Sequence, residues 1–322
     1  MTDLLFNRTL IIGVGLIGSS LARAMREKKL VGDVVGWDVD ASVLARALKL
    51  GVIDRAAQSL EKGLQGADLV VLATPVGAAP QLLAAVASGA GEGAVVIDVG
   101  SVKGAVVDAA AGAGERVHFV PCHPVAGTEQ SGPEAGFAAL FEDRWCILTP
   151  LPREDAPYLA AIDRVAALWR AVGAKVETMD PAHHDLALAV TSHLPHLIAF
   201  TLVGAADDLE AVTEAEVVKY SAGGFRDFTR IAASDPVMWR DVFINNREAV
   251  LEVLGRFTEE LILLQRAIRW GDAETLEKVF RRGRELRRAI VAAGQEKDVP
   301  NFGRDEKAAG NRQPATGNGE RE

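Results

Sequence analysis

The most constraining feature of the sequence is a glycine-rich turn that directly follows a short apolar run near the amino terminus. The run Thr9 to Ile12 leads into Gly13-Val14-Gly15-Leu16-Ile17-Gly18, and a helical pattern follows from Ser19 to Lys28. With this spacing, the first glycine permits a tight turn, the second lets the backbone approach a pyrophosphate, and the third allows close helix–strand packing. The segment therefore predicts a dinucleotide-binding unit whose helix start faces the phosphates.

An acidic residue strengthens this prediction and favours one cofactor. The next apolar run, Val34 to Trp37, ends at Asp38, about 20 residues beyond the last glycine, where a carboxylate can accept hydrogen bonds from the adenosine ribose. A carboxylate there disfavours a 2′-phosphate, so NAD is expected rather than NADP. Ordinary turn glycines with Asp38 as a helix cap are the alternative, which the combined context of strand, turn, helix, strand and acid disfavours. The candidate cofactor contacts are Gly13, Gly15, Leu16, Ile17, Gly18, Asp38, Thr74 and Ser101.

Short apolar runs alternate with helical patterns over the first half of the chain, which is typical of a doubly wound, mostly parallel Rossmann-type sheet. The predicted strands are Leu10 to Ile12, Val34 to Trp37, Leu69 to Ala73, Val95 to Asp98, His118 to Pro121, Cys146 to Thr149 and Lys175 to Thr178. Ligands bind beyond the carboxyl ends of such strands, where the loops at Thr74, Ser101 and His123 are expected to converge. His123 in particular supplies an imidazole where an oxidation needs its base.

A second, helical domain is expected after the sheet. Asp180-Pro181 predicts a helix start, with an N-cap followed by proline in the first helical position. We therefore expect an α/β domain over 1–179, an all-helical domain over 180–294 and a flexible tail over 295–322, where the apolar pattern fails. Within the helical part, apolar residues from Leu254 to Ile268 recur at spacings of three and four. This seam fits either an intrachain core or a subunit contact.

The composition of the chain restricts the classes of partner and the cellular location that we expect. The 322-residue chain has a formal net charge of -9, which argues against nucleic acid as a partner and gives no long-range attraction for an anionic substrate. Two cysteines are too few for a disulfide framework, and the first residues carry no secretion signal, so a cytoplasmic location is expected. The uncharged stretch from Leu69 to Gly91 contains Pro75 and Pro80, which favours buried strand, loop and helix over a membrane span.

Histidines gather at the start of the helical domain. Four of the six lie within fourteen residues; they are His183, His184, His193 and His196. The last two fall on one helix face, and Pro195 between them should kink or start the helix. The cluster could form a polar wall of a substrate pocket, or a zinc site, which the lack of a familiar ligand spacing disfavours. Helix capping or core packing explains at least His183, and no metal is expected.

Arginines lie in an apolar setting further along the chain, in the segment Gly223 to Ala232. An arginine among Phe225 and Phe228 either pairs with a neighbouring acid or grips a substrate carboxylate with its planar fork. We expect an ion pair with Asp227 for Arg226, and a substrate carboxylate for Arg230.

Taken together, these segments resemble the prephenate dehydrogenase family, over nearly all of Thr9 to Arg288. The resemblance rests on several separate segments, which are Gly13 to Ser20 with Asp38, Asp98 to Gly104, Cys122 to Gly132, His184 to His196, and Gly223 to Trp239. It implies an amino-terminal NAD domain, a helical domain that forms a homodimer, and an active site between them. By the same resemblance, His123 bonds the ring hydroxyl, Ser101 assists and Arg230 holds the side-chain carboxylate. Pocket-lining roles fall to Glu129, His184, His193, His196 and Trp239.

The implied reaction is the oxidative decarboxylation of prephenate to 4-hydroxyphenylpyruvate and CO2 in tyrosine biosynthesis. Arogenate, which carries an amino acid side chain, would use the same residues and give tyrosine directly. A β-hydroxyacid or imine reductase of the same two-domain type would not need His123 beside two further imidazoles. A non-catalytic NAD sensor would need only the glycine turn and Asp38. Tyrosine is a further possible ligand, as an inhibitor acting at the active site.

Overall fold

The structure is a computed structural model that describes residues 4–110, 116–207 and 222–292. The chain divides into two compact units, Met1–Gly255 and Arg256–Glu322. The first contains the sheet and most of the described helices, and the second contains the end of one long helix and all of another. The predicted tail over 295–322 lies outside the described residues.

An eight-stranded sheet forms the centre of the first unit, in the order β3-β2-β1-β4-β5-β6-β7-β8. The strands are β1 (Phe6–Ile12), β2 (Val31–Trp37), β3 (Arg55–Ala56), β4 (Leu69–Leu72), β5 (Val95–Asp98), β6 (His118–Pro124), β7 (Trp145–Leu148) and β8 (Lys175–Thr178). Every neighbouring pair is parallel except β6 with β7, where His123 lies opposite Ile147. The predicted mostly parallel, doubly wound sheet is therefore confirmed. The two-residue β3 was not predicted, because it is too short to form a pattern.

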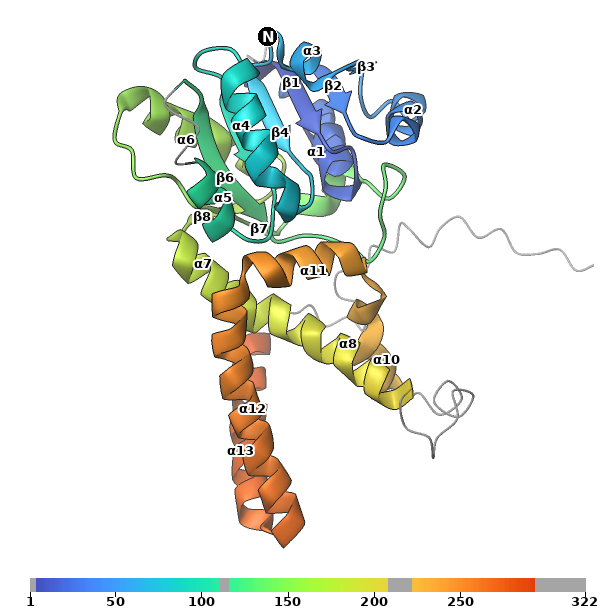
Figure 1. Ribbon diagram of the computed structural model, residues 1–322, viewed down its shortest axis with the longest axis vertical. Helices are drawn as coiled ribbons and strands as arrows, with labels where there is room; N and C mark the ends of the chain where they lie inside the picture. The colour runs from blue at the N-terminus through green and yellow to red at the C-terminus, as the bar shows by residue number, and fades with distance from the viewer. Residues whose placement is uncertain (1–3, 111–115, 208–221, 293–322) are drawn as a thin grey trace, which may run out of the picture. The chain divides into compact units, whose positions relative to one another are not determined.

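Helices cover both faces of this sheet (Figure 1). The helices of this part are α1 (Leu16–Glu27), α2 (Ala41–Lys49), α3 (Leu60–Leu64), η1 (Val76–Ala78), α4 (Ala79–Gly89), α5 (Gly104–Ala110), η2 (Ala138–Phe141) and α6 (Ala156–Ala171). One apolar cluster joins α1, α2 and α6 to one face, and another joins α3, α4 and α5 to the other. Successive residues of β1 divide between them, since Ile11 belongs to the first cluster and Ile12 to the second.

The glycine turn between β1 and α1 is shaped by close approach of the backbone. Gly13 has φ +90, and a Cβ there would lie 2.5 Å from the carbonyl oxygen of Ala73. A Cβ on Gly18 would lie 2.2 Å from the carbonyl oxygen of Gly13. Both positions therefore require glycine for packing, whereas a Cβ on Gly15 would meet nothing within 4 Å. The predicted division of roles among the three glycines agrees with this geometry.

The helical part of the first unit begins after β8. Its elements are α7 (Pro181–Leu188), η3 (Ala189–His193), α8 (Leu194–Asp207), α10 (Gly223–Thr229), η4 (Arg230–Ala233), α11 (Pro236–Asn245) and the start of α12 (Arg247–Trp270). The Asp180 side chain accepts hydrogen bonds from the backbone N–H groups of Ala182 and His183, which confirms the predicted cap. The segment η3 is one turn of π-helix, and Pro195 follows in the first turn of α8. The expected disturbance at Pro195 thus takes the form of a π-turn.

The run from Pro181 to Ala206 is, among the described helices, the one long and apolar enough to cross a bilayer by length and composition. Its polar side chains have other partners, however. Asp185 accepts bonds from the backbone of Lys103 and Gly104 in the sheet part, and His184 and His193 are fully buried. The run is therefore a core helix of the helical domain.

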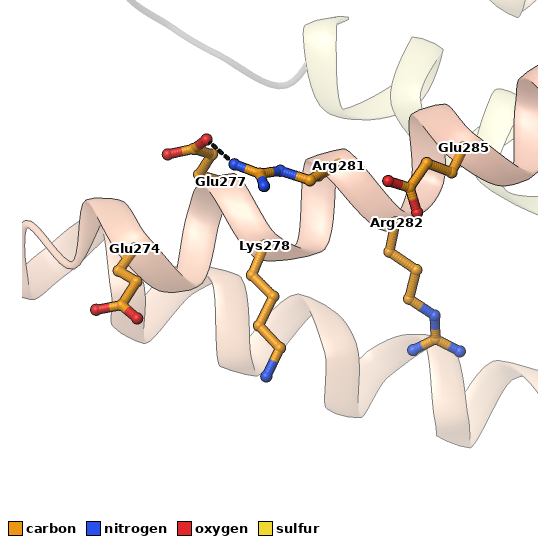
Figure 2. Close-up of a pocket in the computed structure, with 6 residues that line it drawn as sticks. All are labelled: Glu274, Glu277, Lys278, Arg281, Arg282 and Glu285. Carbon is orange, nitrogen blue, oxygen red and sulfur yellow. Dashed lines mark hydrogen bonds and ion pairs between the residues drawn. The ribbon is translucent and has the colours of Figure 1, made fainter.

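The second unit contains the end of α12 and all of α13 (Ala273–Ala292). Leu261 and Ile268 on α12 are 47% and 68% exposed, whereas Leu254, Phe257 and Leu264 are half-buried, so the described residues cover only part of the apolar seam. A shallow pocket on α13 is lined by Glu274, Glu277, Lys278, Arg281, Arg282 and Glu285 (Figure 2). Glu277 and Arg281 are ion-paired one turn apart, and the lining mixes three acids with three bases, which is typical of a solvated helix face.

Candidate active site

The cofactor loop is open where a dinucleotide would need space. Gly15 begins the first turn of α1 with no side chain above it, and Leu16 and Ile17 are partly buried beside it. After the neighbouring strand β4, the Thr74 hydroxyl is buried without a hydrogen-bond partner among the described residues. An open glycine turn and an unpartnered polar atom on the next loop fit NAD, whose pyrophosphate and ribose carry acceptors and donors.

Asp38 lies directly after β2, as predicted. One of its carboxylate oxygens accepts a hydrogen bond from the backbone N–H of Val14 at 3.0 Å, and the other accepts from Asp40 at 3.0 Å. The carboxylate is therefore held against the glycine turn and is only partly buried. This position matches the one where a ribose would be bound.

A buried lysine lies beneath the loops of the site, and its position was not predicted. Lys103 is fully buried, forms an ion pair with Asp98 and donates to the carbonyl oxygen of Cys122 at 2.8 Å. The Asp98 carboxylate also accepts from the backbone N–H groups of Gly100 and Cys122. Together these bonds tie the loop after β5, which contains Ser101, to the end of β6. The sequence contained a signal for this ion pair, because an acid and a lysine lie five residues apart in the segment Asp98 to Gly104. In that segment, only Ser101 was assigned a role from the sequence.

His123 lies at the end of β6 and is 7% exposed. Its Nδ1 lies 2.8 Å from Nε2 of His184, and Nδ1 of His184 lies 2.8 Å from the Asp185 carboxylate. Burial, followed by the charges of His184, Lys103 and His193, holds the pKa of His123 well below its usual value of 6.5. His123 is therefore a neutral imidazole at ordinary pH. His184 is fully buried in contact with His123, and the contact of Asp185 with this pair was not predicted.

A second pair of imidazoles surrounds Trp239. The His196 ring stacks on Trp239 with centroids 3.7 Å apart, and the His193 ring meets the indole edge-on at 6.0 Å. These contacts agree with the predicted shared face of His193 and His196. His196 donates from Nδ1 to the carbonyl oxygen of Ser192, and burial lowers its pKa. The three rings form one packed cluster, in which His193 and Trp239 are buried.

Two buried N–H groups in this cluster have no partner among the described residues. The Asn246 amide donates to Nδ1 of His193 at 3.0 Å, so a neutral His193 carries its proton on Nε2. Burial lowers the pKa of His193 to about 4, which keeps the ring neutral. Its Nε2 and the indole Nε1 of Trp239 are both buried and unpartnered. Two such donors suit a ligand that is rich in acceptor oxygens.

Arg230 is placed at the site by an ion pair. Its guanidinium lies 3.3 Å from the carboxylate of Glu129, with both side chains about 40% exposed, and its charge acts on His196. Arg226 is not paired with Asp227, because no ion pair joins these two described residues. The prediction of an ion pair between Arg226 and Asp227 is therefore wrong. Of the two arginines, Arg230 is the one that has a carboxylate partner.

The histidines do not form a metal centre within the part of the chain that the structure describes. No group of three or more His, Cys, Asp or Glu side chains there could hold a metal ion. The bonds of His184 and His193 are to protein groups, and His183 is exposed. Both ring nitrogens of His184 are occupied by these bonds, so His184 has none left for a zinc ion.

The fold and this site define a class of enzyme. A doubly wound sheet with an open glycine turn and an acid after β2 binds a dinucleotide, and a buried neutral imidazole at the carboxyl edge of the same sheet can accept a proton. The class is that of the NAD-dependent dehydrogenases.

Comparisons with known proteins give the family. The prephenate dehydrogenase nucleotide-binding domain matches residues 21–178, and the dimerization domain of the same family matches residues 180–282. Cyclohexadienyl dehydrogenase from Zymomonas mobilis is 39% identical over 285 residues, covering 88% of this chain and 96% of the relative. Prephenate dehydrogenase from Bacillus subtilis is 36% identical over 295 residues, covering 91% and 78%.

A solved structure agrees with these matches. Prephenate dehydrogenase from Aquifex aeolicus, in complex with hydroxyphenyl propionate and NAD+, superposes with a TM-score of 0.80 at 36% identity, covering 88% of this chain and 98% of that one. The chain belongs to the prephenate dehydrogenase family. It is an NAD-dependent oxidoreductase with prephenate dehydrogenase activity, and its carboxy-terminal part contains a dimerization domain.

Proposed function

We propose that the chain oxidises and decarboxylates prephenate to 4-hydroxyphenylpyruvate, with His123 as the base and Arg230 as the group that holds the side-chain carboxylate. The observation that carries this proposal is the buried neutral imidazole of His123 at the carboxyl end of β6, where its Nδ1 contacts His184. Ser101, on the loop joined to β6 by Lys103, is proposed to assist at the same ring hydroxyl and the cofactor.

Substrate binding follows from the charges of the site. The net charge of -9 gives no general attraction for a dianion, so the anion must be held locally. Arg230 can exchange its bond with Glu129 for a bidentate bond to the side-chain carboxylate, and His193 and Trp239 each offer an unpartnered N–H. The departing ring carboxylate should meet no free cation, because a cation would stabilise the ground state more than the charge-dispersed transition state. The ammonium of Lys103 satisfies this condition, because Asp98 already neutralises it.

The hydride leaves one ring carbon of prephenate, and the proton leaves the hydroxyl oxygen on that same carbon. NAD, when bound, accepts the hydride. His123 takes the hydroxyl proton, so that a ketone forms, and loss of CO2 from the opposite carbon then makes the ring aromatic. The phenolate oxygen takes the proton back from His123, so the reaction consumes prephenate and NAD+ and yields 4-hydroxyphenylpyruvate, CO2 and NADH. General base catalysis of this kind contributes about 10²- to 10⁴-fold in rate.

Arogenate is a second candidate substrate, favoured by one observation. An α-amino acid carries a carboxylate and an ammonium group on the same carbon, and Arg230 with Glu129 presents the two complementary charges 3.3 Å apart. Glu129 would then accept from the ammonium group while Arg230 holds the carboxylate. The similarity to cyclohexadienyl dehydrogenase from Zymomonas mobilis agrees with a site for ring dienes of this type.

The domain boundary and the assembly belong to the same proposal. We place the boundary of the NAD domain at 179 and 180, and assign 180–294 to substrate binding and dimerisation, with 295–322 as a tail. The exposed apolar residues of α12, among them Leu261 and Ile268, supply a surface for a second copy of the chain. A homodimer in the cytoplasm is the expected form of the enzyme.

The first experiment is to measure NADH or NADPH formation by the purified protein with prephenate and with arogenate, each offered NAD and NADP. Turnover with prephenate and NAD supports the main proposal. A preference for arogenate changes the substrate and keeps the roles of His123 and Arg230. Reduction of neither cofactor overturns the proposal and favours a reductase relative or an NAD sensor.

A further inference from the structure

We propose that Asp185 and His184 are positioning residues that fix the tautomer of His123, leaving its Nε2 unprotonated to act as the base. The inference rests on the proposed function, because it explains how His123 is prepared for that role. It adds two residues of α7 as support for the base at the end of β6.

The Asp185 carboxylate is held in one orientation by backbone donors. One oxygen accepts from the N–H of Lys103 at 2.8 Å, and the other accepts from the N–H of Gly104 at 2.8 Å. A Cβ on Gly104 would lie 2.9 Å from the carboxylate, so glycine leaves the space that the acid occupies. Asp185 is 7% exposed. Because each carboxylate oxygen accepts from a backbone N–H, the group acts as a hydrogen-bond acceptor.

The orientation of Asp185 determines where His184 carries its proton. The Nδ1 of His184 lies 2.8 Å from the carboxylate oxygen and must donate to it. In the neutral ring the Nε2 atom then has a lone pair, and this atom lies 2.8 Å from Nδ1 of His123. Full burial of His184 prevents water from replacing either bond.

The proton position on His184 in turn determines which nitrogen of His123 carries a proton. An unprotonated Nε2 on His184 can only accept, so Nδ1 of His123 carries the proton and its Nε2 has the free lone pair. A doubly protonated His184 would reverse this order and place a proton on the atom that must accept one. The groups facing His123 are His184, Lys103 and His193. Burial has the largest effect on its pKa, and a positive charge on any of these groups also favours the neutral form of His123.

The hydrogen bonds from His123 through His184 to Asp185 also stabilise the protonated form of His123. When His123 receives the hydroxyl proton on Nε2, its Nδ1–H remains bonded to His184, whose own Nδ1–H is bonded to the Asp185 carboxylate. The charge on His123 is then stabilised through a chain that needs no reorientation, and the proton returns to the phenolate oxygen from the same Nε2 atom. Over one turnover, the hydrogen-bonded residues His123, His184 and Asp185 neither gain nor lose a proton.

Matched variants at His184 test the tautomer directly. In His184→Gln, the amide can donate to Asp185 and accept from His123, so we expect kcat within about tenfold of the original enzyme. In His184→Leu, neither bond forms, and we expect kcat to fall by about 10³-fold with KM within a few fold, since loss of the correct tautomer removes the base. His183→Gln, on the exposed neighbour, is the control and should leave kcat unchanged.

A spectroscopic measurement keeps the inference testable if a variant does not fold. In isotope-labelled wild-type protein, the ring nitrogens of His123, assigned by comparison with His123→Asn, should show a protonated Nδ1 and an unprotonated Nε2 at neutral pH. Asp185→Asn should shift this pattern, because its amide can donate to His184.

Two results would overturn the inference. One is a His184→Leu variant with near-wild-type turnover, and the other is an unprotonated Nδ1 on His123 in the wild-type protein. Either result leaves the proposed function intact where the wild-type enzyme forms NADH from prephenate. Failure of the wild-type enzyme to form NADH would overturn the proposed function instead.

Discussion

Lys103 and Asp98 form an ion pair that is sealed from solvent directly beneath the candidate active site. The lysine is fully buried, and the aspartate is 2% exposed. The ammonium also holds the carbonyl oxygen of Cys122, the residue before His123, while the backbone N–H of Lys103 holds Asp185. A single residue therefore connects the end of β5, the end of β6 and helix α7.

Loss of this lysine should be strongly destabilising. In Lys103→Met the Asp98 carboxylate stays buried without its cation, and breaking one partner of a buried pair costs about 3–5 kcal/mol. Urea unfolding at fixed protein concentration measures the change. Arg281→Ala, which removes an exposed pair with Glu277, is the control and should cost less than about 1 kcal/mol. Equal effects in the two variants would contradict the structural role of the buried pair.

Substitutions at two glycines of the turn should affect different properties, one the binding of NAD and the other the stability of the fold. Gly15→Ala adds a methyl group where nothing lies within 4 Å, so we expect the melting temperature to change little and NAD affinity to fall at least about tenfold. Gly13→Ala, at φ +90 and against the Ala73 carbonyl, should unfold or strongly destabilise the domain. Calorimetric NAD titration and thermal melting together distinguish these outcomes. Undiminished NAD binding by Gly15→Ala would show that the cofactor does not approach this turn.

His123→Asn should abolish the base while preserving much of the packing. We expect kcat to fall by about 10²- to 10⁴-fold, with the substrate dissociation constant within a few fold. The pKa of His123 lies well below 6.5, so the wild-type enzyme should keep its unprotonated base as the pH is lowered past that value. Steady-state kinetics from pH 8 down to about pH 5 test both points. Turnover of the variant near that of the wild-type enzyme would remove His123 from the mechanism.

Arg230→Ala should act mainly on binding. Loss of the only charge proposed for the side-chain carboxylate is expected to raise KM by about tenfold or more, with a smaller effect on kcat. The matched control is Arg226→Ala, one helical turn earlier and exposed. Initial rates over a range of prephenate concentrations measure the difference. A KM that rises equally in both variants would point to a disturbance of α10 and η4 instead of a lost contact.

His193 should make stability depend on pH in the acidic range. Its folded-state pKa of about 4 lies below the unfolded value of 6.5, so the unfolded chain binds more protons between these values. The contribution is fully present above pH 6.5 and is lost as the pH falls toward 4, by on the order of 3 kcal/mol. In His193→Gln, the free energy of unfolding should fall less steeply over this window than in the wild-type protein, and His183→Gln should not change the slope. Identical slopes for His193→Gln and the wild-type protein would contradict the buried neutral state.

Much of the fold followed from local patterns. Apolar runs fixed the long strands, because a buried parallel strand needs consecutive apolar residues, and Asp180-Pro181 marked the helix start through a cap that operates within three residues. The glycine turn was equally local. Such features depend on neighbours in the sequence, so they can be predicted without knowing the tertiary structure.

The connections between distant segments could not be predicted in this way. His184 and Asp185 lie beside each other in the sequence, but their partners His123 and Lys103 lie 61 and 82 positions away. Only the packing of α7 against the sheet brings His184 into contact with His123. The ion pair of Arg230 with Glu129 spans 101 positions, which explains why the sequence suggested an arginine but not its partner.

The π-turn at Ala189–His193 has a consequence for the evolution of this helix. A π-turn holds one residue more than a regular helical turn, and each residue of an α-helix advances the direction of side chains by about 100°. Deleting one residue here would restore a regular helix and rotate everything after it, carrying His196 away from Trp239 while His184 kept its place behind His123. A change in the length of this turn would therefore separate the two halves of the active site, even where it left every side chain of the site in the sequence.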